Sequence, residues 1–295
     1  MSEAPRARGA APWLAFGLCC SIWGSTFLFI RFSNDTVPPV WGAAVRLLLA
    51  SVLFALLTRM LRAPWPKGAQ LRASLAFGVV DFGVSLPLLY WGEARVPSGI
   101  AAVMFATIPL STAIFARLAG LELLRPRMVL ASLVAIGGVA LLFSSSLGGS
   151  YEFSRLFAVW LAATTAALAG VLLKQAPGAH PFAMNAWAHG VGGVMCVVAS
   201  RLLGETQAWP AGRSWIPILY LATAGSLGAF AAFAWLLQRW PVTRASFIAV
   251  IVPVAALALG AAVRHEHPSP AALAGAVVIL GAVATGILGD LHARR

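Results

Sequence analysis

The chain has 295 residues, of which 60% are hydrophobic and 10% are charged, and its formal net charge is +12. So few charged side chains exclude an ordinary soluble domain, whose surface needs far more charge. The basic residues stand in short clusters between apolar runs, without a basic stripe or a stacking platform, which argues against nucleic acid as a partner.

Apolar runs of about 18 residues or more recur along the whole sequence and predict membrane-spanning helices. We therefore expect an all-α polytopic membrane protein whose solvent is the lipid bilayer. The ten predicted helices cover residues 12–31, 39–58, 72–92, 97–117, 126–146, 155–174, 181–201, 214–237, 241–263 and 269–289. The stretch SSSLGGS at 144–150 divides these helices five and five.

The first predicted helix follows Arg6 and Arg8 and at first sight looks like a signal peptide. Its apolar run is long, and Arg31 ends it without a small-residue cleavage site, so we interpret it as a retained helix. Trp23 lies deep in this helix. It is a candidate for the wall of an apolar cavity, with simple packing as the alternative.

The second predicted helix contains Arg46, roughly 10 Å past Pro39 at 1.5 Å per residue. A permanent charge at that depth is costly in lipid, so this side chain should face protein or water. One interpretation is a structural arginine that bonds carbonyl oxygens or snorkels outward. The other is a contact with a substrate carboxylate, or a gate on the outer side.

The third predicted helix places Asp81 roughly 14 Å past Arg72, deeper than any other acidic residue. Asp81 is either a site for a substrate ammonium group or a proton, or a carboxyl that makes a polar contact between helices. It lies at a depth from which it could pair with Arg46. In the same helix Phe82 could line a cavity and Ser85 could meet a substrate carboxylate or ammonium, while Tyr90 suits either the interfacial belt or the cavity rim.

The later helices carry weaker candidates. Pro109 and Pro253 lie inside predicted helices and can bend or hinge them. The deep residues of the sixth and seventh helices could line a path or simply pack, and they are Trp160, Thr164, Trp187 and His189. In the loop HEHP at 265–268, two histidines two residues apart are weak ligands, so we expect no metal and no cofactor.

The two halves of the sequence repeat. With a shift of 144 residues Pro97 matches Pro241, Pro109 matches Pro253 and Glu122 matches Glu266, and with a shift of 143 Arg31 matches Lys174 and Arg46 matches His189. We therefore expect two five-helix repeats, 1–149 and 150–295. Five is an odd number, so the second repeat must be inverted in the membrane, and inverted repeats are typical of secondary transporters.

The loop charges predict the orientation. The loops and tails on the side of the two termini hold 14 of the 21 Lys and Arg residues, the opposite side holds 6, and Arg46 is the remaining one. Because basic loops stay in the cytoplasm, both termini are expected there.

The segment IWGSTFLFIRFSNDTVPPVWGAAVRLLLASVLFALL resembles the first two helices of the EamA family in the drug/metabolite transporter superfamily. The resemblance rests on Trp23-Gly24-Ser25, on Pro39 and on Arg46 within the second helix. The ends of both halves also fit, since Glu122 and Glu266 are each followed by a proline four residues later. The second half departs from the family pattern, with Ala166 at the position of Trp23 and His189 at that of Arg46.

The resemblance extends over nearly the whole chain and is strongest to YddG-type exporters of aromatic and other amino acids. It implies a bacterial inner-membrane protein, not an enzyme, with a central cavity built from helices 1, 3, 4, 6, 8 and 9. It also implies export without a nucleotide-hydrolysing subunit. We expect a monomer and leave proton coupling open.

The predicted function is therefore secondary transport, in which aromatic and other neutral amino acids leave the cytoplasm by alternating access through a central cavity. One acidic and one basic group inside the membrane suit a zwitterion better than a cation. Export of other small metabolites or cationic drugs is the alternative, and a membrane enzyme or sensor is a remote one, because the chain does not bring several ionisable groups to one depth.

Overall fold

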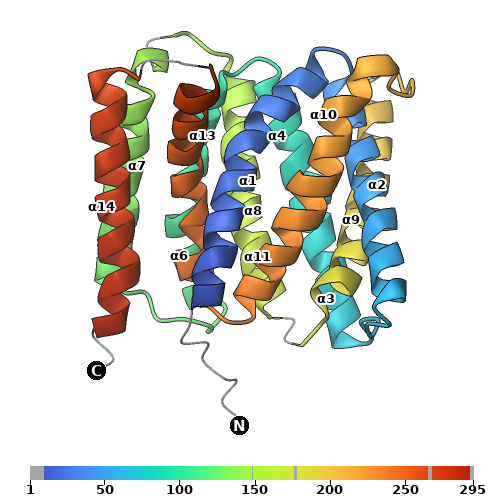
Figure 1. Ribbon diagram of the computed structural model, residues 1–295, viewed down its shortest axis with the longest axis horizontal. Coiled ribbons are helices and arrows are strands. Elements are labelled where there is room, and N and C mark those ends of the chain that lie inside the picture. Colours follow the sequence, from blue (N-terminus) through green and yellow to red (C-terminus); the bar gives the residue numbers. More distant parts are fainter. Residues whose placement is uncertain (1–9, 148, 176–177, 265–267, 293–295) are drawn as a thin grey trace.

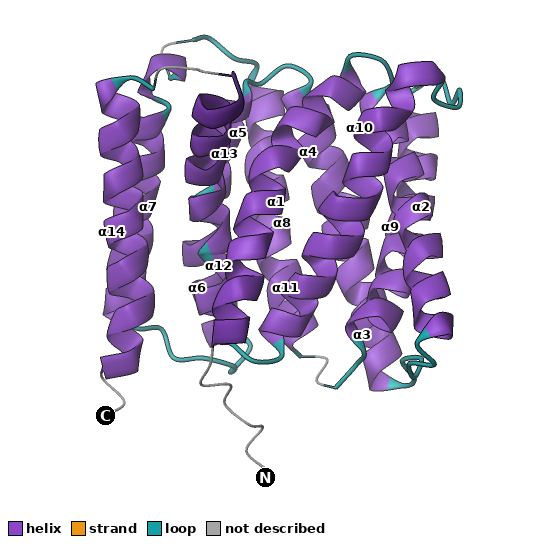
Figure 2. Ribbon diagram, in the orientation of Figure 1, coloured by secondary structure: helices purple, strands orange, loops and turns teal. Residues whose placement is uncertain are grey.

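The computed structural model describes residues 10–147, 149–175, 178–264 and 268–292 (Figure 1). Within these ranges every regular element is a helix (Figure 2). The first half contains α1 (Ala10–Asn34), α2 (Pro39–Met60), α3 (Ala69–Phe77), η1 (Gly78–Ser85), α4 (Leu86–Glu93), α5 (Ser98–Phe105), α6 (Ile108–Leu118), α7 (Pro126–Leu142) and η2 (Ser144–Ser146). The second half contains α8 (Phe153–Lys174), α9 (Pro181–Leu202), η3 (Gly212–Ser214), α10 (Trp215–Tyr220), η4 (Leu221–Gly228), α11 (Ala229–Leu237), α12 (Val242–Ser246), α13 (Ile248–Arg264) and α14 (Pro270–His292).

These elements join into membrane spans. In the described part of the chain, nine continuous helical stretches are long and apolar enough to cross a bilayer, and α7 is a shorter apolar helix of 17 residues. Together they correspond to the ten predicted helices, so the predicted fold class is confirmed. The start of α1 and the end of α14 lie on the same side of the bundle (Figure 1). We call this face the terminus side and the other one the far side.

The third and eighth spans are not uniform α-helices. Each contains an eight-residue π-helical segment, η1 in the third span and η4 in the eighth. The two segments start 143 residues apart, at Gly78 and Leu221, so both repeats carry the same deformation at the same place. Such π-helical turns widen a helix and often occur at functional sites. Neither π-helical segment was predicted from the sequence.

The prolines act differently in the two repeats. The fourth span breaks between α5 and α6, just before Pro109, whose missing N–H cannot bond the preceding turn. In the ninth span the break falls at Phe247, between α12 and α13, while Pro253 lies inside α13. Both spans are therefore interrupted, but at positions that the repeat does not relate.

The spans form a central group flanked by two helix pairs. At one end of the bundle α7 packs along α14, and at the other α2 packs along α9 (Figure 1). The α7–α14 contact depends on small residues. A Cβ atom at Gly275 would lie 2.5 Å from the backbone nitrogen of Leu142 and 2.6 Å from the carbonyl oxygen of Gly138. The small residues of α14 thus allow two backbones to approach closely.

Gly275→Ala is therefore expected to destabilise the protein by about 1–3 kcal/mol, because the added methyl group forces two backbones apart. Gly281→Ala is the matched control in the same helix, since a Cβ atom there would meet nothing within 4 Å. It should be neutral, or stabilising by up to about 1 kcal/mol through helix propensity. Thermal unfolding of both purified variants in detergent measures the difference. Equal unfolding temperatures would contradict the close α7–α14 approach.

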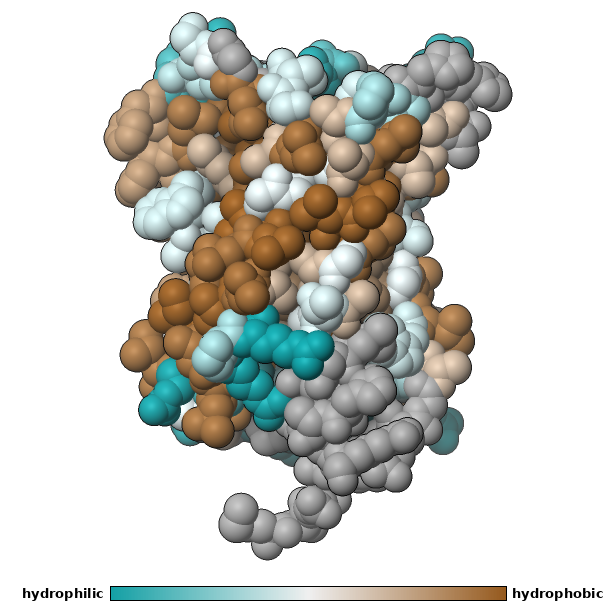
Figure 3. Space-filling model, turned by 90° about the vertical axis from the view of Figure 1, so that its left-hand side faces the viewer, coloured by the Kyte–Doolittle hydropathy of each residue, from teal (hydrophilic) through white to brown (hydrophobic). Residues whose placement is uncertain are grey.

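The outer surface of the α7–α14 pair is apolar. Figure 3 shows a brown, hydrophobic band across this face, with hydrophilic residues above and below it. Exposed leucines and valines on the two helices form part of this face, and they include Leu130, Leu133, Leu273, Val277 and Leu280. The pattern fits a surface whose middle contacts lipid chains and whose edges contact head groups and water.

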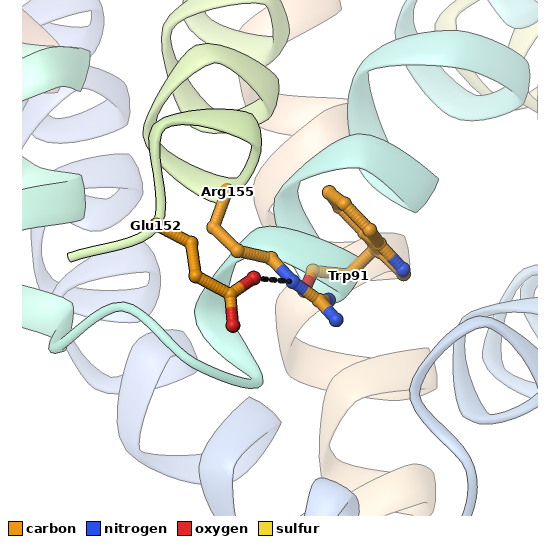
Figure 4. Close-up of polar contacts among 3 residues, drawn as sticks. All are labelled: Trp91, Glu152 and Arg155. Carbon is orange, nitrogen blue, oxygen red and sulfur yellow. Dashed lines mark hydrogen bonds and ion pairs between the residues drawn. The ribbon is translucent and has the colours of Figure 1, made fainter.

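On the far side, Arg155 joins the start of α8 to the end of α4 (Figure 4). Its guanidinium carbon lies 3.6 Å from the centre of the Trp91 ring, and Nη1 donates to the Trp91 carbonyl oxygen at 2.6 Å. Glu152 forms an ion pair with Arg155 at 3.5 Å. This cluster ties together two spans that also line the cavity described below.

Candidate functional site

A cavity occupies the middle of the central group, with about 1120 Å³ of space free of protein atoms, part of which is open solvent. Its walls come from the first, third, fourth, sixth, eighth and ninth spans, with Arg46 added from the second. These are the six spans that the family resemblance implied. The lining residues are Trp23, Thr26, Ile30, Arg46, Phe77, Asp81, Phe82, Ser85, Leu86, Leu89, Ala102, Phe105, Ile108, Thr112, Ala166, Ala167, Gly170, Phe230, Phe233, Val242, Ala245, Ser246, Ile248, Ala249, Val252 and Pro253.

Arg46 is buried, with 3% of its surface exposed, and points into the protein rather than toward lipid. Its Nε donates to the Ser226 hydroxyl of η4 at 3.1 Å, and its Nη1 donates to the Tyr90 hydroxyl of α4 at 3.2 Å. Both partners are neutral oxygens, so the charge itself is not balanced by them. The remaining N–H groups can therefore serve an anionic group in the cavity, since a guanidinium carries five donors in all.

The position of Arg46 depends on how α2 begins. Pro39 is well suited to the first turn because its missing N–H has no partner there. The next two backbone N–H groups, of Val40 and Trp41, donate to the Glu205 carboxylate at 3.1 and 2.8 Å. Glu205 lies in the loop after α9, so a residue far along the chain anchors the helix that carries the arginine. Glu205 was not predicted from the sequence, because a loop glutamate has no local signal for such a role.

Asp81 lines the same cavity from the π-helical segment η1. Among the described residues none donates a hydrogen bond to its carboxylate, and Arg46 does not come within the 4.0 Å of an ion pair. One turn further on, the Ser85 hydroxyl donates to the Ala162 carbonyl oxygen at 2.7 Å. The cavity therefore presents a positive and a negative group at its wall that do not neutralise each other directly.

The rest of the wall is largely aromatic. Trp23 contacts Phe230 and Phe233, with ring centres 5.1 and 5.3 Å apart, and its indole nitrogen donates to the Gly225 carbonyl oxygen at 3.4 Å. Phe82 contacts Phe230 at 4.8 Å and Phe77 at 5.2 Å. Trp23 and Phe82 were predicted from the sequence. The other rings of the wall were not, and they are Phe77, Phe105, Phe230 and Phe233. The helical spacing of Phe77, Asp81 and Ser85 was a usable signal for the first of these.

Two further candidates lie behind the cavity wall. Tyr90 is fully buried and reaches the cavity only through its bond to Arg46. His189 is also fully buried, packs on the Phe82 ring at 4.0 Å between centres, and places Nδ1 3.0 Å from the Asn185 carbonyl oxygen. Tyr90 and His189 therefore support the residues of the cavity wall and do not line the cavity themselves.

The structure does not bring Trp160, Thr164 and Trp187 to the cavity. Trp160 and Trp187 are 45% and 46% exposed, and the Thr164 hydroxyl donates to the Trp160 carbonyl oxygen within α8. In α8 the cavity is lined instead by small residues, Ala166, Ala167 and Gly170. These three residues were predicted from their depth along their helices. The rotation of those helices, α8 and α9, directs their side chains away from the cavity. Of the two prolines, Pro253 lines the cavity and Pro109 is buried outside it.

Metal ligation receives no support from the described residues, among which no group of three or more His, Cys, Asp or Glu side chains gathers. The first three residues of HEHP, 265–267, lie outside the described part of the chain, and so does the predicted loop residue Glu266.

Ten spans in two repeats around a largely apolar cavity that contains a few polar groups are the architecture of a membrane transporter rather than of an enzyme. The chain belongs to the EamA-like transporter family, which matches residues 11–144 and 154–287. This confirms the resemblance to the EamA family that the sequence motifs indicated. The likeness to YddG-type exporters in particular stays a prediction.

Several relatives extend over most of the chain. The "Uncharacterized inner membrane transporter YedA" of Escherichia coli (strain K12) is 31% identical, over 91% of this chain and 88% of the relative. A "Probable terminal-alkyne amino-acid exporter" of Streptantibioticus cattleyicolor is 25% identical, over 92% of each chain. A solved crystal structure has the same fold, with a TM-score of 0.81 and 17% identity over 97% of this chain and 99% of the other.

Proposed function

We propose that this transporter exports amino acids, aromatic and other neutral ones, from the cytoplasm by alternating access through the central cavity. The observation that carries the proposal is that Arg46 and Asp81 line one cavity with an aromatic wall and are not paired with each other. A zwitterion fits this arrangement, with its carboxylate at Arg46, its ammonium at Asp81 and its side chain against Trp23 and Phe82. The relative that is described as an amino-acid exporter supports the same substrate class.

The direction of transport rests on the orientation in the membrane. Both termini lie on the face that holds most of the loop Lys and Arg residues, and such faces stay in the cytoplasm (Figure 1). The terminus side is therefore the side on which we place substrate uptake, in a bacterial inner membrane. The protein acts as a monomer in this proposal.

Counterflow in proteoliposomes tests the substrate class. Vesicles loaded with unlabelled phenylalanine or tryptophan should accumulate the labelled amino acid, whereas the matching amine, which lacks the carboxylate, and the matching acid, which lacks the ammonium, should not exchange. Labelled sugars and quaternary ammonium ions complete the panel. If the amine or the quaternary ammonium ions exchange and the amino acids do not, the proposal would be wrong. The protein would then be an exporter of cationic compounds.

The aromatic wall gives a selectivity prediction. Phe233→Leu keeps an apolar side chain but removes a ring, so phenylalanine export should fall about threefold to tenfold relative to threonine export, the scale of one aromatic contact. Trp160→Leu removes an exposed ring outside the cavity and should leave the ratio unchanged. Initial rates of both substrates in the same proteoliposomes give the ratio. An equal effect of the two substitutions would argue that the aromatic wall does not select the substrate.

A further inference from the structure

The corner between α11 and α12 on the terminus side is held by charged residues from other spans. Lys174, the last residue of α8, donates from Nζ to the carbonyl oxygens of Leu237 and Trp240, the latter at 2.9 Å. These carbonyls belong to the end of α11 and the turn after it, where helix geometry leaves such groups without partners. Lys174 thus ties the end of the sixth span to the end of the eighth.

Glu122 holds the other half of this corner. It lies in the loop between α6 and α7, and its carboxylate accepts from the Val242 backbone N–H and from the Thr243 hydroxyl, both at 2.5 Å. Pro241, which precedes α12, makes no side-chain cap of its own. The cap of the ninth span is therefore supplied by the fourth span. Glu122 also lies close enough to Lys174 for the two charges to interact.

The same corner forms one end of the cavity. Val242, whose N–H bonds Glu122, lines the cavity, together with Ala245 and Ser246 of α12. Gly170, one turn before Lys174, and Thr112 of α6 line it on the facing walls. A displacement of the α11–α12 corner would therefore open or close the cavity toward the terminus side.

Among the described residues, Arg31 of the first repeat does not make on the far side the contact that Lys174 makes on the terminus side. Arg31 is the counterpart of Lys174 and ends the first span. In the ranges that the structure describes, its side chain is exposed and donates no hydrogen bond. The counterpart of Leu237 is Glu93, whose two carboxylate oxygens are buried without a hydrogen-bond partner among the described residues. Arg31 lies close enough to Glu93 for the two charges to interact. The two ends of the cavity thus differ in the hydrogen bonds of this basic residue, although the repeat relates Arg31 to Lys174.

We infer that Lys174 and Glu122 form a latch that closes the cavity on the terminus side, and that the structure represents the state closed on that side. When inverted repeats exchange conformations, the closed contact of one side is released as that of the other forms. In that opposite state Arg31 bonds the end of α4, as Lys174 bonds the end of α11 here. The inference rests on the alternating access of the proposed function but not on the substrate.

Thiol labelling tests the latch without any substrate. A cysteine at Ala166, a partly exposed residue that lines the cavity, is labelled by a membrane-impermeant reagent added from either side of oriented vesicles. In Lys174→Met and Glu122→Gln, labelling from the terminus side should rise, relative to the far side, by about tenfold, because each substitution removes a charged hydrogen-bond partner. Arg239→Met is the matched control. Arg239 stands at the same corner, but it hydrogen-bonds and stacks on Trp235 of the helix that it directly follows, α11, and not on another span. An unchanged ratio in both latch variants, with a normal unfolding temperature, would overturn the inference.

A cross-link covers the case in which the latch variants do not fold. Cysteines at Glu122 and Thr243, which contact each other through their side chains, are joined by a short reagent that a reductant cleaves. Cross-linking should lower counterflow at least about tenfold and leave far-side labelling at Ala166→Cys intact, and reduction should restore transport. Full transport with the cross-link in place would show that this corner does not move. A failure of amino acids to exchange, with labelling shifted as expected, would contradict the substrate and not the latch.

Discussion

Arg46→Gln is expected to lower amino-acid export by more than about 30-fold, equivalent to at least about 2 kcal/mol, because it leaves the substrate carboxylate without its charged partner in a buried site. Arg46 is the basic residue that lines the cavity, and its two bonds to Ser226 and Tyr90 leave donors free for a ligand. Arg46→Lys keeps the charge but loses the planar fork, so it should retain only part of the activity. Initial rates of counterflow measure these effects.

Ser226→Ala tests whether the charge of Arg46 or the hydrogen bond that holds its side chain matters for export. It removes the hydroxyl that accepts from Arg46 Nε but keeps the guanidinium in the cavity. Its effect should be much smaller than that of Arg46→Gln. Substrate binding to the purified protein, measured by calorimetry, gives a second check. If Arg46→Gln still bound the amino acid as tightly as the unchanged protein while transport was lost, Arg46 would be a gate and not the carboxylate contact.

Asp81→Asn is the second substitution with a large expected effect, a loss of export of more than about 30-fold in protein that inserts and folds normally. The carboxylate lines the cavity and accepts no hydrogen bond from the described residues, so the substitution breaks no structural hydrogen bond. The amide keeps the size of the side chain and removes the charge that an ammonium group would meet. Unfolding temperature and counterflow on the same preparation separate folding from transport.

The same variant tests proton coupling. Transport by the unchanged protein is compared with and without an imposed pH gradient, and the comparison is repeated with Asp81→Asn. If Asp81 carries the coupling proton, any residual transport of the variant should no longer respond to the gradient. Ser85→Ala is the control, because Ser85 is an uncharged residue one turn away on the same wall. Transport by this variant should still respond to the pH gradient. Normal export by Asp81→Asn with an unchanged response would return Asp81 to a structural role.

Much of the fold could be read from local properties of the sequence. A run of about 20 apolar residues has one stable form in a bilayer, a helix, because its backbone groups must bond within the segment. The number of spans, their approximate limits and the repeat followed from such runs and from prolines in phase. The positions of η1 and η4 did not, because no residue type in the sequence marks a π-helical turn.

The residues of the candidate site could likewise be predicted from the sequence only in part. Arg46 and Asp81 were identifiable from the sequence because lipid rejects charged groups, so a charge at that depth must face protein or a cavity. Trp160 and Trp187 were misleading because an indole ring at a helix surface is stable against lipid as well as against protein. For an apolar residue, the sequence gives its depth in the membrane but not the direction in which its side chain points.

The sequence by itself determined that this protein is a ten-span membrane protein with an inverted repeat and two opposite charges within the membrane. Only the tertiary structure decided which faces of the spans enclose the cavity, and that Glu205, Lys174 and Glu122 hold the ends of other helices. The physical reason is that hydrophobic burial in a bilayer acts on each helix separately, whereas helix rotation and capping by distant residues depend on packing between helices.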